Sequence, residues 1–463
     1  MKYILGIDVG TTRVKACIVD ENGNIISSSF SKNNLYSLDE NKFEQDAKEI
    51  WYSVIKAVKG IPSKIKAKVE SLSISTQGGT LFPFDKNGNP LRRGISWMDL
   101  RAIYLSKKLL KHHSKNFFFS ITGRTPDIGC LPLLEIIYLK QNEKNIFRNT
   151  AKYLFVDSLL YYKMTGNIYI DPSNAIMTML YDVKQNKWSE DILSLIGIKK
   201  EQLPEILPSG KEIGYLKPSV SKLLGLSYKV KVHIGGHDQY CAALGAGVIR
   251  TGDVMLSCGT AWAIVVVVDK PIFNLSSEFT PGPHVIESKY GLLTAISMAG
   301  IFIDWIKELL KIKDYKDVNK LIKESSIGSN GIIIIPSVEG KSLFSGISVN
   351  HSTSSILRAS LEGLCFEVKR KLKFVKKMGV KLNSLTMVGG AAKNPIFSQI
   401  ISDITGLNVK IPETSETGSL GAAILAGANK IYKIRKEFKP FKLNLKIYEE
   451  IFKKYINLKR RLI

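Results

Sequence analysis

The stretch Gly6-Ile7-Asp8-Val9-Gly10-Thr11-Thr12-Arg13-Val14-Lys15-Ala16 decides the fold of this chain. It joins an apolar strand, Tyr3 to Val9, to a second apolar strand, Val14 to Val19, through a Gly-Thr-Thr tip. This pattern predicts a β-hairpin. Backbone N–H groups and hydroxyls at such a tip suit a polyphosphate. The carboxylate of Asp8, two residues before the tip, adds an oxygen ligand of the kind that Mg²⁺ prefers.

The same signature returns later in the chain. Asp253 to Ser257 leads into Cys258-Gly259-Thr260 and then into an apolar strand, Ala263 to Val268. Two such hairpins suggest a duplicated architecture, and we place the boundary between residues 1–245 and 246–463.

A glycine pair forms a third candidate ligand site. The predicted strand Ser384 to Val388 is followed by Gly389-Gly390-Ala391-Ala392-Lys393-Asn394 and a predicted helix, Ile396 to Thr405. Strand, glycine pair and helix is an arrangement in which backbone approaches a ligand at a helix N-terminus. Further on, the small residues of the predicted helix Gly418 to Ala428 indicate close helix packing.

Asp238 follows a predicted strand, Val230 to Ile234, and a glycine pair, and it precedes a predicted helix, Ala242 to Gly247. One interpretation is a general base that accepts the proton of an attacking hydroxyl. The other is the N-cap of that helix, a position that Asp fills well. Local sequence leaves both open.

A second cluster combines amide, aromatic and charged side chains. Gln77 and Gly78 follow the predicted strand Val69 to Ser75, and Trp97, Asp99 and Arg101 lie downstream. An aromatic face with charged hydrogen-bonding groups suits a polyhydroxylated ligand. Alternatively, Asp99 and Arg101 form only an ion pair.

Composition excludes several classes of protein. The chain has 463 residues, 44% hydrophobic and 23% charged, a balance typical of a folded protein with two to four domains. The net charge of +25 is spread along the chain and is not clustered with aromatic residues, so nucleic acid is not the expected partner. We expect a basic amphipathic helix at the C-terminal end.

The sequence lacks the motifs of secreted, membrane, zinc-binding and P-loop proteins. The apolar runs are too short to cross a bilayer, and the acidic Asp8 in the first apolar stretch argues against a signal peptide, so we expect a cytoplasmic protein without a membrane partner. The five cysteines form no Cys-x-x-Cys pair, so neither disulfides nor zinc are expected. A Gly-x-x-x-x-Gly-Lys loop is absent, which argues against a P-loop kinase.

Together these motifs resemble the FGGY carbohydrate kinases of the actin-like ATPase superfamily. The first phosphate motif is Gly6 to Ala16, the second is Ser257-Cys258-Gly259-Thr260, and the adenosine motif is Gly389 to Asn394. The sequences Ile121-Thr122-Gly123, Trp188-Ser189 and Arg358 to Gly363 agree with the family as well. The resemblance extends over about residues 3 to 428.

The resemblance implies an α/β fold with two ribonuclease H-like (actin-like ATPase) domains around a central cleft. It implies ATP and Mg²⁺ as cofactors, with sugar bound mainly by the first domain and nucleotide by the second. Asp238 corresponds to the catalytic base and Gln239 to a substrate contact. The phosphates are expected at Gly10, Thr11, Thr12, Lys15, Gly259 and Thr260, the adenosine at Gly300, Gly389, Gly390 and Asn394, and magnesium at Asp8 through water.

The resemblance is less informative about the sugar. Xylulose kinases usually carry Gln-Met-His-Gly where this chain has Gln77-Gly78-Gly79-Thr80, and the Arg-Glu pair of glycerol kinases is missing too. The stretch Pro336 to Gly346 is shorter than the family's usual loop. We expect phosphorylation of a terminal hydroxyl of a small sugar, with a pentulose such as xylulose first and glycerol, erythritol, hexuloses and sugar acids as alternatives. A non-catalytic actin-like ATPase is the alternative from another class, and a homodimer is compatible with the sequence.

Overall fold

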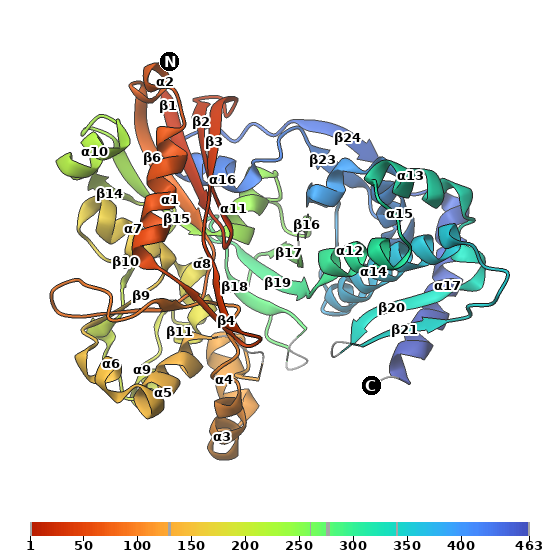
Figure 1. The fold of residues 1–463 in the computed structure, drawn as a ribbon, viewed down its shortest axis with the longest axis horizontal. Helices are drawn as coiled ribbons and strands as arrows, with labels where there is room; N and C mark the ends of the chain where they lie inside the picture. Colours follow the sequence, from red (N-terminus) through yellow and green to blue (C-terminus); the bar gives the residue numbers. More distant parts are fainter. Residues whose placement is uncertain (1, 128–130, 260, 275–277, 339–340, 462–463) are drawn as a thin grey trace. The chain divides into compact units, whose positions relative to one another are not determined.

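The computed structural model describes residues 2–127, 131–259, 261–274, 278–338 and 341–461 (Figure 1). The chain forms two compact units. The first unit contains Met1–Ile249, Asp269–Leu292 and Glu416–Tyr432, and the second contains Arg250–Val268, Leu293–Ser415 and Lys433–Ile463. Each unit therefore collects segments that are far apart in the sequence. The predicted division into residues 1–245 and 246–463 is one of sequence domains and stays a prediction.

A six-stranded mixed sheet forms the centre of the first unit, with strand order β14-β15-β6-β1-β2-β3. Strands β1, β2 and β3 form an antiparallel meander, and β6 runs parallel to both β1 and β15. The predicted first hairpin is confirmed, because β1 and β2 pair from Tyr3↔Asp20 to Val9↔Val14. The bounds are β1 Tyr3–Val9, β2 Arg13–Asp20, β3 Ile25–Lys32, β6 Val69–Thr76, β14 Glu212–Tyr215 and β15 Lys231–His237.

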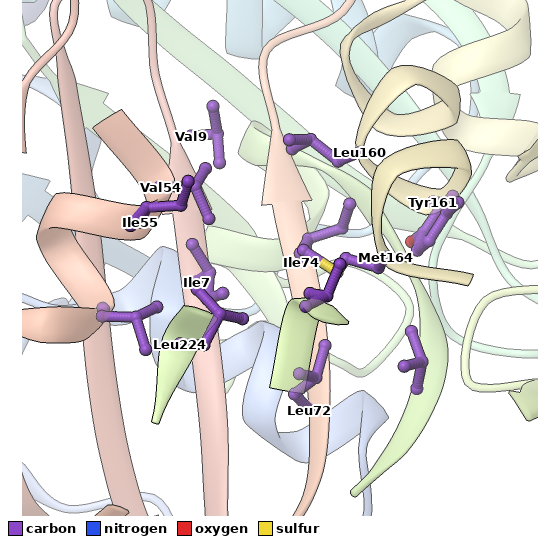
Figure 2. Packing of buried hydrophobic residues seen from close by; sticks show 14 of the residues in the cluster. Ile7, Val9, Val54, Ile55, Leu72, Ile74, Leu160, Tyr161, Met164 and Leu224 are labelled. Atoms are coloured by element: carbon purple, nitrogen blue, oxygen red, sulfur yellow. The ribbon is translucent and has the colours of Figure 1, made fainter. Parts of the chain in front are cut away.

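Helices α1 (Ala47–Lys59), α7 (Val156–Thr165) and α10 (Pro218–Leu224) share one core with this sheet. Figure 2 shows side chains of β1 and β6, such as Ile7 and Ile74, meeting residues of these helices. Helix α1 begins where the Asp46 carboxylate accepts from two backbone N–H groups of the first turn, and its buried Ile50, Val54 and Val58 repeat at helical spacing. Its apolar stripe faces the sheet for this reason.

Two helices, α11 (Asp238–Gly245) and α16 (Thr417–Leu425), pack very closely in the first unit. A Cβ placed on Gly421 would lie 1.9 Å from the carbonyl oxygen of Cys241, and one on Gly245 would lie 2.0 Å from that of Thr417. A Cβ on Gly6 of β1 would lie 1.8 Å from the Ser419 carbonyl oxygen. Backbone therefore contacts backbone at three places, which confirms the close packing predicted for the small-residue helix.

A second core in the same unit contains residues from Leu81 to Leu203 that come from helices, short strands and the segments between them. Short strands accompany it: β4 Tyr36–Asp39, β5 Lys42–Gln45 and β8 Gly94–Ile95 form one sheet, and β7 Phe82–Phe84 pairs with β9 Lys152–Leu154, β10 Tyr169–Ile170 with β13 Glu205–Ile206, and β11 Tyr181–Asp182 with β12 Lys187–Trp188. The further helices are α2 Ser63–Lys66, α3 Tyr104–His112, α4 Lys115–Thr122, α5 Pro132–Asn142, α6 Lys144–Asn149, α8 Pro172–Ala175, η1 Ile176–Thr178, α9 Glu190–Ile196 and η2 Lys200–Gln202. Strand β18 (Thr280–Pro283) also belongs to this unit, and the boundary between the units passes along β19 (Tyr290–Ile296).

The second unit has a sheet that contains the consecutive strands β17-β16-β22-β23-β24. Their bounds are β16 Val254–Cys258, β17 Trp262–Val268, β22 Leu385–Gly389, β23 Val409–Pro412 and β24 Ile434–Phe438. The pairing Cys258↔Trp262 closes the second predicted hairpin, which is confirmed as a hairpin. The other elements are α12 Ala299–Leu309, α13 Tyr315–Glu324, η3 Ser329–Gly331, β20 Ile333–Val338, β21 Lys341–Ser345, α14 Thr353–Lys377, η4 Gly390–Lys393, α15 Pro395–Thr405 and α17 Lys442–Arg460.

Helix α17 is the predicted basic amphipathic helix, and the prediction is confirmed. Its buried Tyr448, Phe452 and Tyr455 surround Phe366 of α14, with ring centroids 5.2 to 6.1 Å apart. The Tyr448 hydroxyl donates to the buried Glu362 at 2.7 Å. In the described part of the chain, no helix is both long and apolar enough to cross a membrane.

Candidate active site

The tip of the first hairpin is fixed by hydrogen bonds within the first unit. The Gly10 N–H donates to the carbonyl of Arg13 at 3.0 Å, and the Asn33 side chain donates to the Gly10 carbonyl at 2.9 Å. Thr12 is exposed, and Gly10 and Thr11 are partly buried. A tip held in this way presents its hydroxyls and N–H groups in one conformation.

The structure brings three predicted residues together at this tip. The Thr11 hydroxyl donates to Gln77 Oε1 at 2.5 Å, and Trp97 Nε1 donates to the same hydroxyl at 2.9 Å. The Trp97 side chain remains 41% exposed, so its ring is available to a ligand. Sequence reasoning missed Gln45, which donates to the Thr11 carbonyl at 3.1 Å and accepts from the Gln77 amide. Gln45 lies at the end of a four-residue strand and carries no sequence signal of its own.

Asp8 lies at the end of β1, next to this tip. The Ser75 hydroxyl donates to Asp8 Oδ1 at 2.7 Å. Burial raises the pKa of the Asp8 carboxyl to about 6, with the charge of Asp238 adding to the effect and the bond from Ser75 opposing it. The Lys15 ammonium forms an ion pair with the Glu416 carboxylate at 3.0 Å.

Asp238 is the first residue of α11 and follows the last residue of β15. Burial raises the pKa of its carboxyl to about 6, although contacts to Gln239 oppose the rise. The side chain is 28% exposed, which leaves it open to a ligand. The helix begins four residues before the predicted start at Ala242, and its N-cap is His237 without a side-chain cap bond. Helix capping by Asp238 is therefore not observed.

The residues next to Asp238 contribute a histidine whose pKa is lowered and a glutamine oxygen that is buried. Burial lowers the pKa of His237 to about 4, and its Nδ1 lies 3.4 Å from Asp238 Oδ1. Gln239 Oε1 is buried without a hydrogen-bond partner among the described residues. Gly78 is closely covered: a Cβ there would lie 2.7 Å from Met177 and 2.8 Å from the His237 ring. The absence of a side chain at Gly78 therefore lets Met177 and the His237 ring pack against its backbone. These two side chains fill the space beside Gly78, so the glycine does not open room for a ligand.

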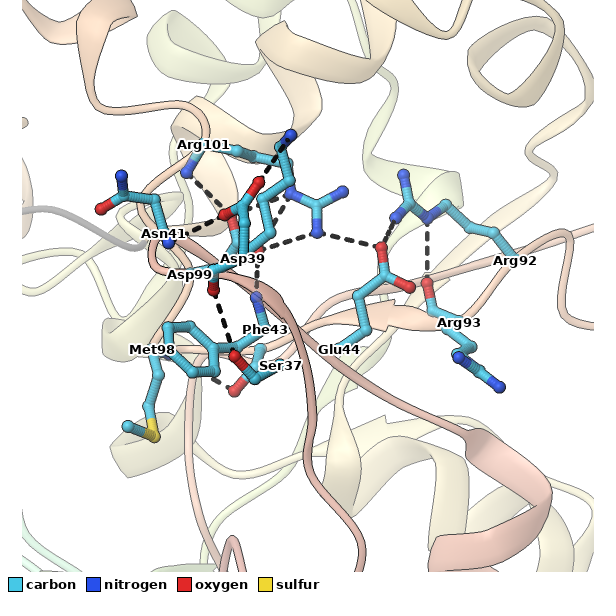
Figure 3. A network of polar contacts seen from close by, with 12 residues as sticks. Ser37, Asp39, Asn41, Phe43, Glu44, Arg92, Arg93, Met98, Asp99 and Arg101 are labelled. Carbon is cyan, nitrogen blue, oxygen red and sulfur yellow. Dashed lines mark hydrogen bonds and ion pairs between the residues drawn. The ribbon is translucent and has the colours of Figure 1, made fainter.

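Asp99 and Arg101 form the ion pair that the sequence left open as an alternative (Figure 3). The two charged groups lie 2.8 Å apart, and the Asp99 side chain is fully buried. Asp99 also accepts from the backbone N–H groups of Phe43 and Arg101, at 2.7 and 2.8 Å, and Arg101 contacts Glu44 at 2.9 Å. The carboxylates beside it raise the pKa of the Arg101 guanidinium against the opposing effect of burial. Since these partners occupy Asp99, its predicted contact with a ligand gains no support from this geometry.

Arg124 is a second residue that sequence reasoning missed. Its Nε donates to the Thr280 hydroxyl at 3.1 Å, and within the described residues its two terminal nitrogens have no hydrogen-bond or ion-pair partner. Burial lowers the pKa of the guanidinium to about 10, with Tyr240 opposing the effect. The charge of Arg124 also contributes to the lowered pKa of His237, so it lies in the neighbourhood of the residue that precedes Asp238. A partly buried cation without a counterion is unusual, because burying a charge is costly unless it is paired.

The remaining predicted residues lie in the second unit. Gly389 ends β22 with φ of 88°, and a Cβ there would lie 2.6 Å from the Cys258 carbonyl oxygen, so only glycine fits. A Cβ on Gly390 would meet nothing within 4 Å. Asn394 caps α15 by accepting from the N–H groups of Ile396 and Phe397 at 3.0 and 3.2 Å. Gly259 lies at the tip of the second hairpin and Gly300 in the first turn of α12, while Thr260 lies outside the described residues.

Asp8 is the residue of the first unit that we test for a fit to a magnesium ion. Ser75 Oγ lies 2.7 Å from Asp8 Oδ1, and the charges of Asp238 and Glu416 raise the Asp8 pKa while that of Lys15 lowers it. However, the described residues contain no cluster of three or more side chains that could hold a metal. Mg²⁺ commonly takes one or two carboxylates and completes its shell with water and phosphate oxygens. A single carboxylate such as Asp8 fits that mode of binding.

Comparisons with known proteins identify the family. The model of the FGGY family of carbohydrate kinases, N-terminal domain, matches residues 3–245, and that of the C-terminal domain matches residues 254–429. A xylulose kinase from Staphylococcus epidermidis is 28% identical over 98% of this chain and 96% of its own length. A glycerol kinase from Saccharolobus islandicus is 29% identical over 95% of this chain and 92% of its own length.

A solved structure has the same fold. The gluconate kinase from Lactobacillus acidophilus superimposes with a TM-score of 0.94, covering 100% of this chain and 98% of its own, at 24% identity. These relatives are similar to the chain along nearly its whole length, and their names refer to different acceptors. The chain therefore belongs to the FGGY family of carbohydrate kinases, and it is an ATP-binding transferase of that family.

Proposed function

We propose that this kinase transfers the γ-phosphoryl group of ATP to a terminal hydroxyl of a small sugar, and that a pentulose such as xylulose is the first candidate. The observation that carries the proposal is the carboxylate of Asp238. It is partly exposed at the start of α11, and it lies close enough to Asp8, beside the first phosphate hairpin, for its charge to raise the Asp8 pKa. A base beside a phosphate-binding tip is the arrangement that phosphoryl transfer requires.

Asp238 accepts the hydroxyl proton as the sugar oxygen bonds to the γ-phosphorus, and the bond from that phosphorus to the β,γ-bridging oxygen breaks to release ADP. A raised pKa suits this role, because a base is most effective when its pKa lies near the working pH. Thr11 and Thr12 offer hydroxyls to the phosphates, and Lys15 offers positive charge. Asp8 would hold Mg²⁺, and the ion would then supply positive charge to the phosphates.

The acceptor is assigned to the first unit and the nucleotide largely to the second. We propose Gln77, Trp97 and Gln239 as the acceptor contacts, because Trp97 is exposed and the buried Gln239 oxygen has no partner in the part of the chain that the structure describes. We assign Gly78, Asp99 and Arg101 a role in packing and ion pairing at this site, without direct contact to the acceptor. Gly259, Gly300, Gly389, Gly390 and Asn394 form the proposed nucleotide site, with Thr260 added from the family resemblance.

The test is ADP release by the purified chain with ATP, Mg²⁺ and a panel of pentuloses, hexuloses, polyols and aldonates. We expect sugar-dependent release with one group of acceptors far above the rest, because a hydrogen-bonding site rejects analogues that lack the expected group. If no panel member raises ADP release above the sugar-free rate, the acceptor assignment is wrong.

Arg124 favours a second candidate, a sugar acid. The guanidinium has no carboxylate partner among the described residues and lies in the neighbourhood of His237, so a carboxylate on the acceptor would supply a counterion. If aldonates are the acceptors, Arg124→Met should lower kcat/KM for the best aldonate by about 10–100-fold, the loss of a charge-assisted hydrogen bond. Steady-state kinetics measures this, with Lys108→Met on the exposed face of α3 as the control. The pentulose stays the candidate if the enzyme prefers ketoses and if Arg124→Met leaves kcat/KM for aldonates unchanged.

Gly390→Val should weaken ATP binding by about tenfold or more, because a branched side chain would occupy the space assigned to the adenosine. The protein itself accepts the side chain, since a Cβ at Gly390 meets nothing within 4 Å. Equilibrium titration with ATP measures the effect, and an unchanged thermal unfolding midpoint is the control. A variant with the wild-type dissociation constant would remove this loop from the nucleotide site.

A further inference from the structure

A buried aspartate, Asp171, lies at the centre of a hydrogen-bonded cluster in the first unit. The side chain accepts from the Ser173 backbone N–H at 2.7 Å and from the Ser173 hydroxyl, while its other oxygen accepts from Asn174 Nδ2 at 2.8 Å. The Ser209 hydroxyl adds a weaker contact at 3.3 Å. Asp171 is only 1% exposed, so these donors replace water almost completely.

Two arms lead from Asp171 to the ends of two neighbouring strands. The Ser173 hydroxyl accepts from the backbone N–H of His237, the last residue of β15, at 2.9 Å. The Asn174 amide, which already donates to Asp171, donates its second hydrogen to the Thr76 hydroxyl at 3.2 Å. Thr76 is the last residue of β6, and it is the parallel partner of His237. One carboxylate therefore connects both strand ends through two short side chains.

The residues that follow these strand ends are those assigned to the reaction. Asp238 follows His237, and Gln77 follows Thr76. The pairing of β15 with β6 ends at His237 and Thr76, just before Asp238 and Gln77, because α11 begins at this point while β6 runs into a loop. Thr11 and Gln45 hold the Gln77 side chain from one side. Since proton transfer depends steeply on geometry, a displacement of about 1 Å is costly.

We propose that Asp171 is a positioning residue that sets the distance between the base Asp238 and the acceptor contact Gln77. The assignment rests on the proposed function. The arm through Ser173 holds the base, and the arm through Asn174 holds the acceptor contact. Asp171 itself contacts neither reacting atoms nor, in this assignment, substrate.

The two arms make different predictions, which a purely structural role would not. Ser173→Ala cuts the arm to His237, so kcat should fall about tenfold and the acidic limb of the pH–rate profile should move, with KM for the acceptor changed less than about twofold. Asn174→Ala cuts the arm to Thr76, so KM for the acceptor should rise about tenfold with a smaller effect on kcat. Asp171→Asn replaces one of the two acceptor oxygens by an amide donor and removes the negative charge that both arms share, so it weakens both arms and should show both changes. KM for ATP should stay near the wild-type value in all three.

Asp182 is the matched control in the same unit. It is 8% exposed and accepts from the backbone N–H groups of Lys184 and Gln185 at 2.8 and 2.9 Å, as Asp171 does in its own turn. Asp182→Asn should lower the thermal unfolding midpoint without changing kcat, KM or the pH profile. If Ser173→Ala and Asn174→Ala behave like Asp182→Asn, the positioning role is wrong even where Asp171→Asn fails to fold. A wild-type enzyme without any sugar-dependent ADP release overturns the proposed function, and with it this assignment.

Discussion

Asp238→Asn is expected to lose about 10²–10⁴-fold of its sugar-dependent kcat, because the amide has nearly the shape of the carboxylate and accepts no proton. The nucleotide dissociation constant should change little, since within the described residues no hydrogen bond or ion pair joins Asp238 to a predicted nucleotide residue. Coupled ADP release at saturating sugar and ATP measures kcat, and titration measures ATP binding. A variant that kept more than about a tenth of the wild-type kcat would show that Asp238 is not the base.

Two further measurements separate chemistry from folding in that variant. Because burial raises the pKa of Asp238 to about 6, wild-type kcat/KM should rise with pH through about 6 as the carboxyl ionises, and Asp238→Asn should lack this limb. The folded state disfavours the charged carboxylate, so replacing Asp238 should keep or raise the thermal unfolding midpoint above pH 7. A lowered midpoint would point to a structural cause of the lost activity.

Gly421→Ala is expected to destabilise the protein by about 3 kcal/mol or more, at the upper end of overpacking effects. The added Cβ would lie 1.9 Å from the Cys241 carbonyl oxygen and 2.6 Å from the carbonyl carbon, so the backbone of α11 or α16 must move. We expect the thermal unfolding midpoint to fall by about 6 °C or more. Because α11 begins with Asp238, activity should fall with it.

The control for this substitution lies in the same helix. Ala422→Gly removes a buried Cβ from α16, so it costs helix propensity and the burial of one methyl group without overpacking, together about 2 kcal/mol. Thermal unfolding of both variants at one pH compares them directly. If the two midpoints were equal, the close approach of α11 and α16 would not be the source of the effect.

Turn residues and the spacing of apolar residues predicted the hairpins and several helices, because neighbouring residues determine these elements. The Gly-Thr tip and the alternating apolar residues of Tyr3 to Val19 form a hairpin because turn and strand preferences agree there. The helix after Gly389-Gly390 and the close packing of α16 also follow from neighbouring residues. The start of α11 was wrong by four residues, because Asp238 to Cys241 carry no periodic pattern that distinguishes a helix from a loop.

Contacts between side chains from distant segments could not be predicted in this way, because no local pattern indicates which segments meet. The sequence left Asp99 open between a ligand contact and an ion pair, and the structure shows the pair together with Glu44, which lies far away in the chain. Gln45 and Arg124 carry no local signal, since their partners Thr11 and Thr280 come from other elements. The candidate site stays a prediction, although the structure brings Thr11, Gln77 and Trp97 into direct contact.

The division of the first unit into three segments has a consequence for synthesis of the chain. Helix α16 lies within the segment Glu416–Tyr432, yet it packs backbone to backbone on β1 and α11, which are made much earlier. Until the ribosome has added that segment, the nascent first unit exposes the glycine-lined surface that α16 covers. Closing it brings together residues separated by more than 400 positions, from Gly6 to Ser419, and such non-local contacts form late. This surface stays uncovered from the synthesis of Gly245, the last residue of α11, until that of Thr417, the first residue of α16.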